Sequence, residues 1–107
     1  MGALRARRQC APARAAPAAQ RAITRGSIPT LIIAGSYDAI TSPQAAQAAA
    51  KPLTRARLVI IPGVGHFVVP KSDCAQRVMA SFLADPAAPD TGCVAALKPP
   101  PFTIAPR

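Results

Sequence analysis

Residues 28–38, Ile-Pro-Thr-Leu-Ile-Ile-Ala-Gly-Ser-Tyr-Asp, and residues 57–66, Arg-Leu-Val-Ile-Ile-Pro-Gly-Val-Gly-His, decide the predicted fold. Each contains a continuous apolar run, which is typical of a strand buried on both faces of a parallel sheet. Parallel neighbours need a crossover of about a dozen residues or more, usually a helix, and the intervening segment is long enough for one. The sequence therefore predicts a βαβ unit with strands over 30–34 and 57–61.

Two helices are predicted beside these strands. Thr41-Ser42-Pro43 starts the crossover helix, because a hydroxyl residue caps it and proline suits its first position. Residues 44–50 favour a helix by propensity, and Pro52 ends it. A second helix is predicted over 73–84, with Ser72 and Asp73 as caps. Its larger apolar residues share one face and are expected to pack on the sheet: Val78, Met79, Phe82 and Leu83.

One acidic residue and the only histidine follow the two predicted strands. Asp38 comes after the first strand, and His66 comes after the second, behind the turn Gly63-Val64-Gly65. The carboxyl ends of parallel strands, about 4.8 Å apart, meet at the edge where open sheets place functional groups. We expect Asp38 and His66 to meet there, as a carboxylate that orients the imidazole of a nucleophilic triad.

Each of these residues has an alternative, purely structural role. Asp38 is also typical of a turn that bonds its own backbone, and His66 of a histidine packed in a turn. A metal site is disfavoured, because there is no second histidine and no cysteine at ligand spacing, so we expect no metal and no other cofactor.

The nucleophile of such a triad has no candidate in the sequence. In α/β-hydrolases the chain order is nucleophile, acid and histidine, and the serine lies in a G-x-S-x-G turn. These 107 residues contain no G-x-S-x-G. We therefore expect the nucleophile to lie on residues outside this chain, for example on a separate chain.

The composition is strongly basic, with a net charge of +9 and no glutamate. Residues 1–27 are rich in Ala, Arg and Pro without helical or strand periodicity, which predicts a disordered basic leader before a domain over 28–107. Such a block can bind nucleic acid, which leaves a small basic nucleic-acid-binding module as an alternative function. No aromatic residues interleave with the arginines, so we expect no nucleic-acid partner.

No membrane span is expected, because no apolar run reaches about 18 residues. Arginines and prolines interrupt the leader, which makes it a poor secretory signal. The tail from Lys98 to Phe102 is a proline run. It is expected to lie back over the body with Phe102 as its anchor, the alternative being a proline-rich interaction segment.

Three cysteines, Cys10, Cys74 and Cys93, leave one without a partner if two of them pair. Cys74 and Cys93 flank a predicted chain reversal, and from spacing alone they are either a disulfide or two buried thiols. A disulfide would imply an exported protein. Cys10 would then be unpaired or need a partner outside the chain.

Together these motifs resemble the carboxyl-terminal region of the tripeptidyl-aminopeptidase-like α/β-hydrolases, relatives of the prolyl aminopeptidases, over about residues 28–102. The resemblance implies the carboxyl-terminal βαβα portion of an α/β-hydrolase fold. It also implies Asp38 as triad acid, His66 as triad base and a disulfide between Cys74 and Cys93. It is carried by these segments: residues 28–38, Thr41-x-Pro43, Ala56–Val59, Gly63-x-Gly65-His66, Cys74, Cys93 and Pro100-Pro101-Phe102. Ala39 and Ser42 depart from it, since the family often has proline at both positions.

The family resemblance also implies a function. Its members are typically exported serine hydrolases that remove short peptides or proline-containing residues from peptide amino termini. This chain is then expected to be a carboxyl-terminal domain or fragment of an exported or periplasmic peptidase. It would supply acid and histidine to a site that acts on peptide amino termini and would be inactive alone.

Overall fold

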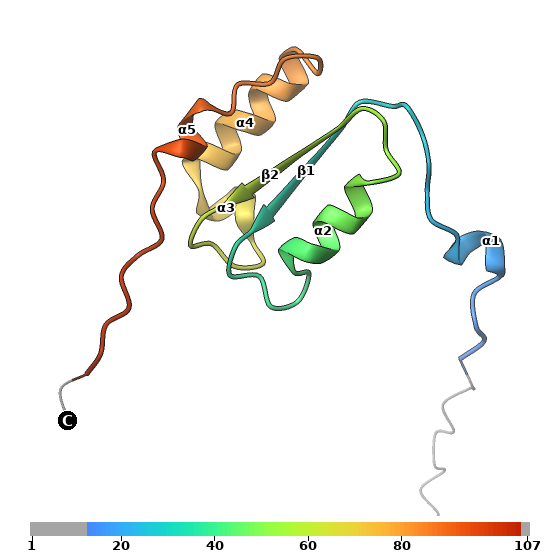
Figure 1. The fold of residues 1–107 in the computed structure, drawn as a ribbon, viewed down its shortest axis with the longest axis horizontal. Helices are drawn as coiled ribbons and strands as arrows, with labels where there is room; N and C mark the ends of the chain where they lie inside the picture. The colour runs from blue at the N-terminus through green and yellow to red at the C-terminus, as the bar shows by residue number, and fades with distance from the viewer. Residues whose placement is uncertain (1–12, 106–107) are drawn as a thin grey trace, which may run out of the picture.

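A computed structural model describes residues 13–105, and a βαβ unit forms its centre (Figure 1). Strands β1 (Thr30–Gly35) and β2 (Ala56–Ile61) pair in parallel, with Thr30 opposite Ala56 and Gly35 opposite Ile61. Helix α2 (Pro43–Ala50) connects them. Each strand is one residue longer than predicted, and the predicted parallel pairing is confirmed.

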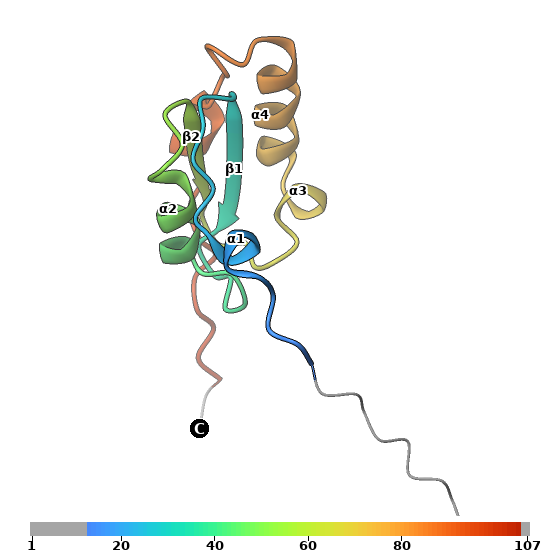
Figure 2. The same cartoon turned by 90° about the vertical axis from the view of Figure 1, so that its right-hand side faces the viewer.

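Helices cover both faces of the two-stranded sheet. α2 lies on one face, and α3 (Val68–Lys71) and α4 (Asp73–Ala84) lie on the other (Figure 2). The Ser42 hydroxyl caps α2 by accepting from the Ala45 amide at 3.2 Å, and Pro43 occupies the first helical position. The predicted helix starts are therefore confirmed, and the bounds of α4 match the prediction.

The core lies between the sheet and the α3–α4 layer. Its buried members are Val59, Ile61, Val68, Cys74, Ala75 and Val78. Ile61 and Val78 are fully buried, and each such side chain contributes about 1.5–3 kcal/mol relative to an exposed position. The fold therefore depends mainly on the packing of α3 and α4 against the β1–β2 sheet.

The predicted apolar face of α4 is only partly buried. Val78 belongs to the core, but Met79 is 38% exposed and Leu83 is 72% exposed. The expectation that all four large residues pack on the sheet was therefore wrong. Two strands are too narrow to cover the whole stripe, so the helix buries the side that carries Cys74, Ala75 and Val78.

Two single-turn helices that follow β2 were not predicted. α3 begins at Val68 directly after the histidine loop, and α5 (Gly92–Ala95) lies at the end of the predicted chain reversal. A disulfide joins Cys74 at the start of α4 to Cys93 in α5, with 5.8 Å between their Cα atoms. The cross-link holds α5 against the core, where Val94 and Leu97 also pack.

The leader and the tail leave the body at opposite sides (Figure 1). Part of the leader, predicted to be irregular, forms one exposed turn, α1 (Ala18–Arg21), and Gly26 bridges to Leu53. Cys10 lies outside the described residues.

The tail is not anchored as predicted. Phe102 stacks near Tyr37 with 6.3 Å between ring centroids but stays 87% exposed, so it is not the buried anchor that was expected. Within residues 13–105, no helix is both long and apolar enough to cross a membrane.

Candidate functional site

The loops that follow the two strands are hydrogen-bonded to each other at the carboxyl edge of the sheet. The Tyr37 amide donates to the Val64 carbonyl at 3.0 Å, and the Gly63 amide donates to the Ser36 hydroxyl at 2.8 Å. Gly63 has φ +72°, a left-handed conformation that favours glycine. The main chain therefore positions the Asp38 loop and the His66 loop as one unit.

Gly35 permits the close approach of these loops. A Cβ atom at this position would overlap the Val64 carbonyl oxygen and lie 2.5 Å from the Gly65 carbonyl oxygen. Both atoms belong to the main chain, so a side chain at position 35 would have to displace the segment that leads to His66. A residue without Cβ is therefore needed at the end of β1.

Asp38 and His66 meet where the sequence placed them. Asp38 Oδ2 lies 3.0 Å from His66 Nδ1, although 28 residues separate them in the chain. The Asp38 side chain is 4% exposed, and the His66 side chain is 40% exposed. A buried carboxylate thus holds one nitrogen of an imidazole that is accessible from outside.

Asp38 has its structural role as well. Its Oδ1 accepts the amides of Ile40 at 2.8 Å and Thr41 at 2.9 Å, as an aspartate in a turn does. Burial raises the pKa of Asp38, but the hydrogen bonds from Thr41, Ile40 and His66 outweigh it and hold the pKa well below its usual range. The carboxylate is therefore charged at neutral pH and can only accept hydrogen bonds.

Thr41 joins this pair, although the sequence predicted it only as part of a helix start. Its hydroxyl lies 2.8 Å from Asp38 Oδ2 and 3.1 Å from His66 Nδ1. A hydroxyl has one proton, and the charged carboxylate is the stronger acceptor, so Thr41 donates to Asp38. The spacing Asp-x-x-Thr was the signal that could have indicated this contact.

These contacts favour one tautomer of the neutral imidazole. With Asp38 charged and the Thr41 proton directed at it, Nδ1 must carry the ring proton to bond with Asp38 Oδ2. Nε2 then carries a lone pair. An arrangement in which a carboxylate holds Nδ1–H while Nε2 is free to accept a proton is that of a general base.

The space beside the imidazole is lined by the turn that carries it. A cavity of about 400 Å³ is bordered by residues 63–67 and Lys71. The Phe67 ring stands edge-on to the imidazole, with 5.5 Å between ring centroids. His66 is thus reached from a shallow, mostly apolar surface. Among residues 13–105 there is no group of three or more His, Cys, Asp or Glu side chains that could hold a metal ion.

The sequence model of one family, described as TAP-like protein, matches residues 1–95. This match covers most of the chain. The chain belongs to the TAP-like protein family. No curated protein and no solved structure matches the chain.

The extent of the TAP-like match differs from the extent of the sequence resemblance. The family match includes the leader, which was predicted to lie outside the domain. The match also ends before Pro100-Pro101-Phe102, which the sequence resemblance included. The small α/β architecture, with parallel strands and helices on both faces, is consistent with part of a TAP-like α/β-hydrolase domain. The boundary between residues 27 and 28 stays a prediction.

Proposed function

We propose that this TAP-like chain supplies the acid and the base of a serine hydrolase triad, as the carboxyl-terminal part of a peptidase whose nucleophile lies outside the chain. The observation that carries the proposal is the 3.0 Å contact between Asp38 Oδ2 and His66 Nδ1 at the carboxyl edge of parallel strands. The absence of G-x-S-x-G from the sequence supports an external nucleophile.

In the completed site, His66 Nε2 takes the proton of the serine hydroxyl as the serine attacks the scissile carbonyl. The same proton then passes from Nε2 to the leaving amine. Asp38 holds Nδ1–H and stabilises the imidazolium that forms between these steps. Thr41 positions the Asp38 carboxylate through its amide and its hydroxyl.

The proposed substrate is the amino terminus of a peptide, and the proposed location is exported or periplasmic. Both rest on the resemblance to tripeptidyl-aminopeptidase-like hydrolases. The disulfide between Cys74 and Cys93 supports export, because such bonds persist mainly in oxidising compartments. The proline-rich interaction segment stays a prediction, since Pro99 and Pro100 lie against Gly63 but both are exposed.

The tautomer of His66 tests the proposed acid–base pair directly. His66 is the only histidine, so its two ring nitrogens can be assigned without ambiguity in a ¹⁵N-labelled chain. At a pH where the ring is neutral, we expect Nδ1 to be the protonated nitrogen. Asp38→Asn should shift the population toward the Nε2–H tautomer, because an amide can donate to Nδ1. In an assembled hydrolase the same change is expected to lower kcat by about 10⁴-fold.

Variants of Thr41 provide the matched control. Thr41→Ser keeps the hydroxyl and should keep the Nδ1–H tautomer of His66. Thr41→Val removes the hydroxyl and should weaken the preference for that tautomer. Two results would contradict the proposed roles of Asp38 and His66. The first is a wild-type chain in which the His66 ring carries its proton mainly on Nε2, and the second is an Asp38→Asn chain with an unchanged His66 tautomer.

The isolated chain is expected to be inactive as a hydrolase. Without a nucleophile elbow, purified chain should hydrolyse neither peptide p-nitroanilides nor p-nitrophenyl esters above the rate of the His66→Ala variant. A fluorophosphonate probe should not label it. Turnover or labelling that disappears when one serine of the chain is replaced would show that the chain has its own nucleophile.

A further inference from the structure

We propose that Ser36 is a positioning residue for His66, which acts by holding the turn at Gly63, and that Pro99 and Pro100 hold the same turn from the tail. The inference rests on the proposed function for the role of His66 as a base, and it names the residues that keep this base against its acid. The contacts at Gly63 stand independently of that role.

The turn at Gly63 sets the direction in which the chain leaves the sheet. Residues 62–65 alone separate the end of β2 from His66, so a change in this turn moves the imidazole. Among residues 13–105, Gly63 alone has a positive φ, at +72°. Glycine adopts positive and negative φ about equally readily, so contacts from other segments must select this conformation.

Ser36 makes one of these contacts through its side chain. Its hydroxyl oxygen accepts the Gly63 amide at 2.8 Å, in a partly buried position and across 27 residues of sequence. The Ser36 amide donates to the carbonyl of Ile61, the last residue of β2, at 2.9 Å. Ser36 is therefore fixed to the strand by its main chain and to the turn by its side chain. Without the hydroxyl, the Gly63 amide would lose its acceptor.

The tail makes the second contact, through the Cα atom of Gly63. A Cβ atom at position 63 would lie 2.6 Å from Pro100 Cδ and 3.1 Å from the Pro99 Cα atom, so the tail packs directly on the glycine. Both prolines are exposed on their other sides. The tail is fixed just before them, because Leu97 packs against the core and Cys93 is disulfide-bonded. Proline has a fixed φ, so this segment loses little freedom when it packs on the turn.

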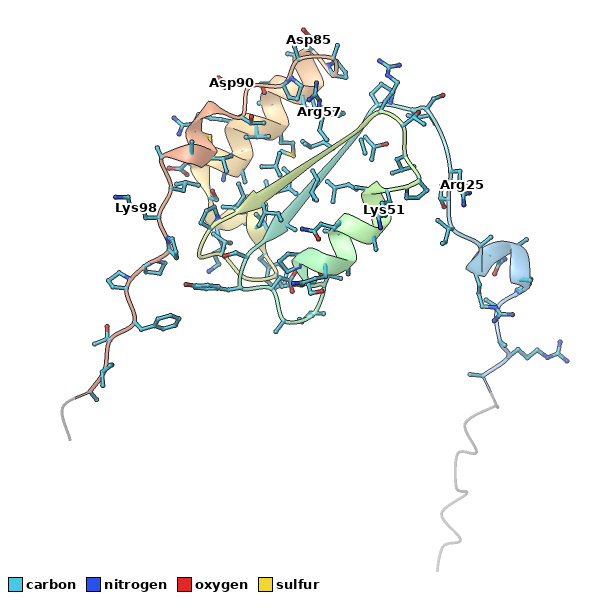
Figure 3. All side chains as sticks on the ribbon, in the orientation of Figure 1. Arg25, Lys51, Arg57, Asp85, Asp90 and Lys98 are labelled. Carbon is cyan, nitrogen blue, oxygen red and sulfur yellow. A yellow bond between two sulfur atoms is a disulfide. The ribbon has the colours of Figure 1, made fainter. Side chains whose placement is uncertain are left out.

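The course of the tail agrees with this contact. In Figure 3 the tail, from Lys98 onward, runs past the carboxyl ends of both strands, whereas Arg57 and Asp85 lie toward the amino ends of the strands. The turn at Gly63 is thus enclosed by the acid loop and the tail, two segments that are distant from it in the sequence.

Ser36 acts through Gly63 and not on the imidazole itself. Within residues 13–105, the hydrogen bonds of the His66 ring go to Asp38 and Thr41, and none goes to Ser36. The Ser36 hydroxyl is instead engaged by the Gly63 amide. Ser36 is therefore a support of the proposed base and not the missing nucleophile.

Two substitutions of Ser36 in the full, disulfide-bonded chain test this role. Ser36→Ala should speed hydrogen exchange of the Gly63 amide about tenfold, because the amide loses its acceptor. It should also lower the population of Nδ1–H in the ¹⁵N spectrum of His66, because the imidazole moves away from Asp38. Ser36→Thr keeps the hydroxyl and should restore both readouts. Ser27→Ala, which removes an exposed hydroxyl, should change neither.

The contribution of the tail is tested by replacing Pro99 and Pro100 together with glycine. The flexible tail should leave the turn, speed exchange of the Gly63 amide and lower the Nδ1–H population of His66. Pro86→Gly is the matched control. It loosens an exposed loop next to Asp85, toward the other end of the strands, and should leave Gly63 and His66 unchanged (Figure 3).

Three results would overturn the proposal. The first is unchanged Gly63 exchange and an unchanged His66 spectrum in Ser36→Ala, and the second is equal effects of alanine and threonine at position 36. The third is an equal increase of exchange throughout β2 and the turn, since that would show only a general loss of stability.

The proposed function and this inference can fail separately. A wild-type chain with the His66 proton mainly on Nε2 would contradict the acid–base pair, while Gly63 exchange would still show whether Ser36 holds the turn. A wild-type chain with Nδ1–H that persists in Ser36→Ala would leave the acid–base pair standing and remove Ser36 from its support.

Discussion

Gly35→Ala is expected to lower the free energy of unfolding by about 3 kcal/mol, at the upper end of the usual cost of overpacking. The new methyl group would overlap the Val64 carbonyl oxygen and lie 2.5 Å from that of Gly65. Both obstacles are main-chain atoms, so neither can move aside by changing a rotamer. The segment before His66 must shift, and the imidazole must move away from Asp38. Denaturant unfolding and the ¹⁵N spectrum of His66 measure the two effects.

Gly26→Ala is the matched control for this substitution. Nothing lies within 4 Å of a Cβ atom at position 26, so alanine there is expected to leave both the unfolding midpoint and the His66 spectrum unchanged. Equal effects of the two alanines would show that the cost is a general property of replacing glycine. A Gly35→Ala chain with wild-type stability and tautomer would contradict the close approach of the two loops.

Loss of the Cys74–Cys93 disulfide is expected to cost about 3 kcal/mol, the loop-closure entropy for a bond that spans 19 residues. Cys74 is 3% exposed within the core, and Cys93 lies in α5. Without the bond, α5 should detach from β2. Alanine at both positions is preferred to serine, which would place a hydroxyl in the core. Denaturant unfolding of the double variant measures the loss.

The reduced wild-type chain provides a second measurement of the same bond. A reducing agent should lower the stability of the wild-type chain to about that of the Cys74→Ala/Cys93→Ala variant, and it should leave the variant unchanged. An oxidised chain and a reduced chain with equal stability would show that the core alone holds α5 in place.

Several features could be predicted from local sequence because their physical causes are local. The apolar runs of β1 and β2 indicate strands buried on both faces, and the length between them requires a crossover. Ser42, Pro43 and Ser72 mark helix starts through contacts within a few residues. The convergence of Asp38 and His66 follows from these elements, since parallel strands must end at the same edge.

Other features depend on contacts that no local pattern encodes. The burial of the apolar face of α4 was overestimated. The width of the sheet decides how much of a helix the sheet can cover, and Met79 and Leu83 stay exposed beyond the two strands. Phe102 was expected to anchor the tail, but it stays 87% exposed beside the Tyr37 ring. α3 and α5 are single turns whose own hydrogen bonds are too few to form a helix without tertiary contacts.

The sequence by itself determined the βαβ order of this TAP-like chain, the edge at which its acid and histidine meet, and the absence of a G-x-S-x-G turn. Only the tertiary structure decided that Thr41 completes the pair, that Gly35 admits the histidine loop and that, within residues 13–105, no third strand joins the sheet. The physical reason is the distance along the chain over which each kind of interaction acts. Caps and apolar runs act over a few residues, whereas these three features arise only where loops and strands distant in the chain pack together.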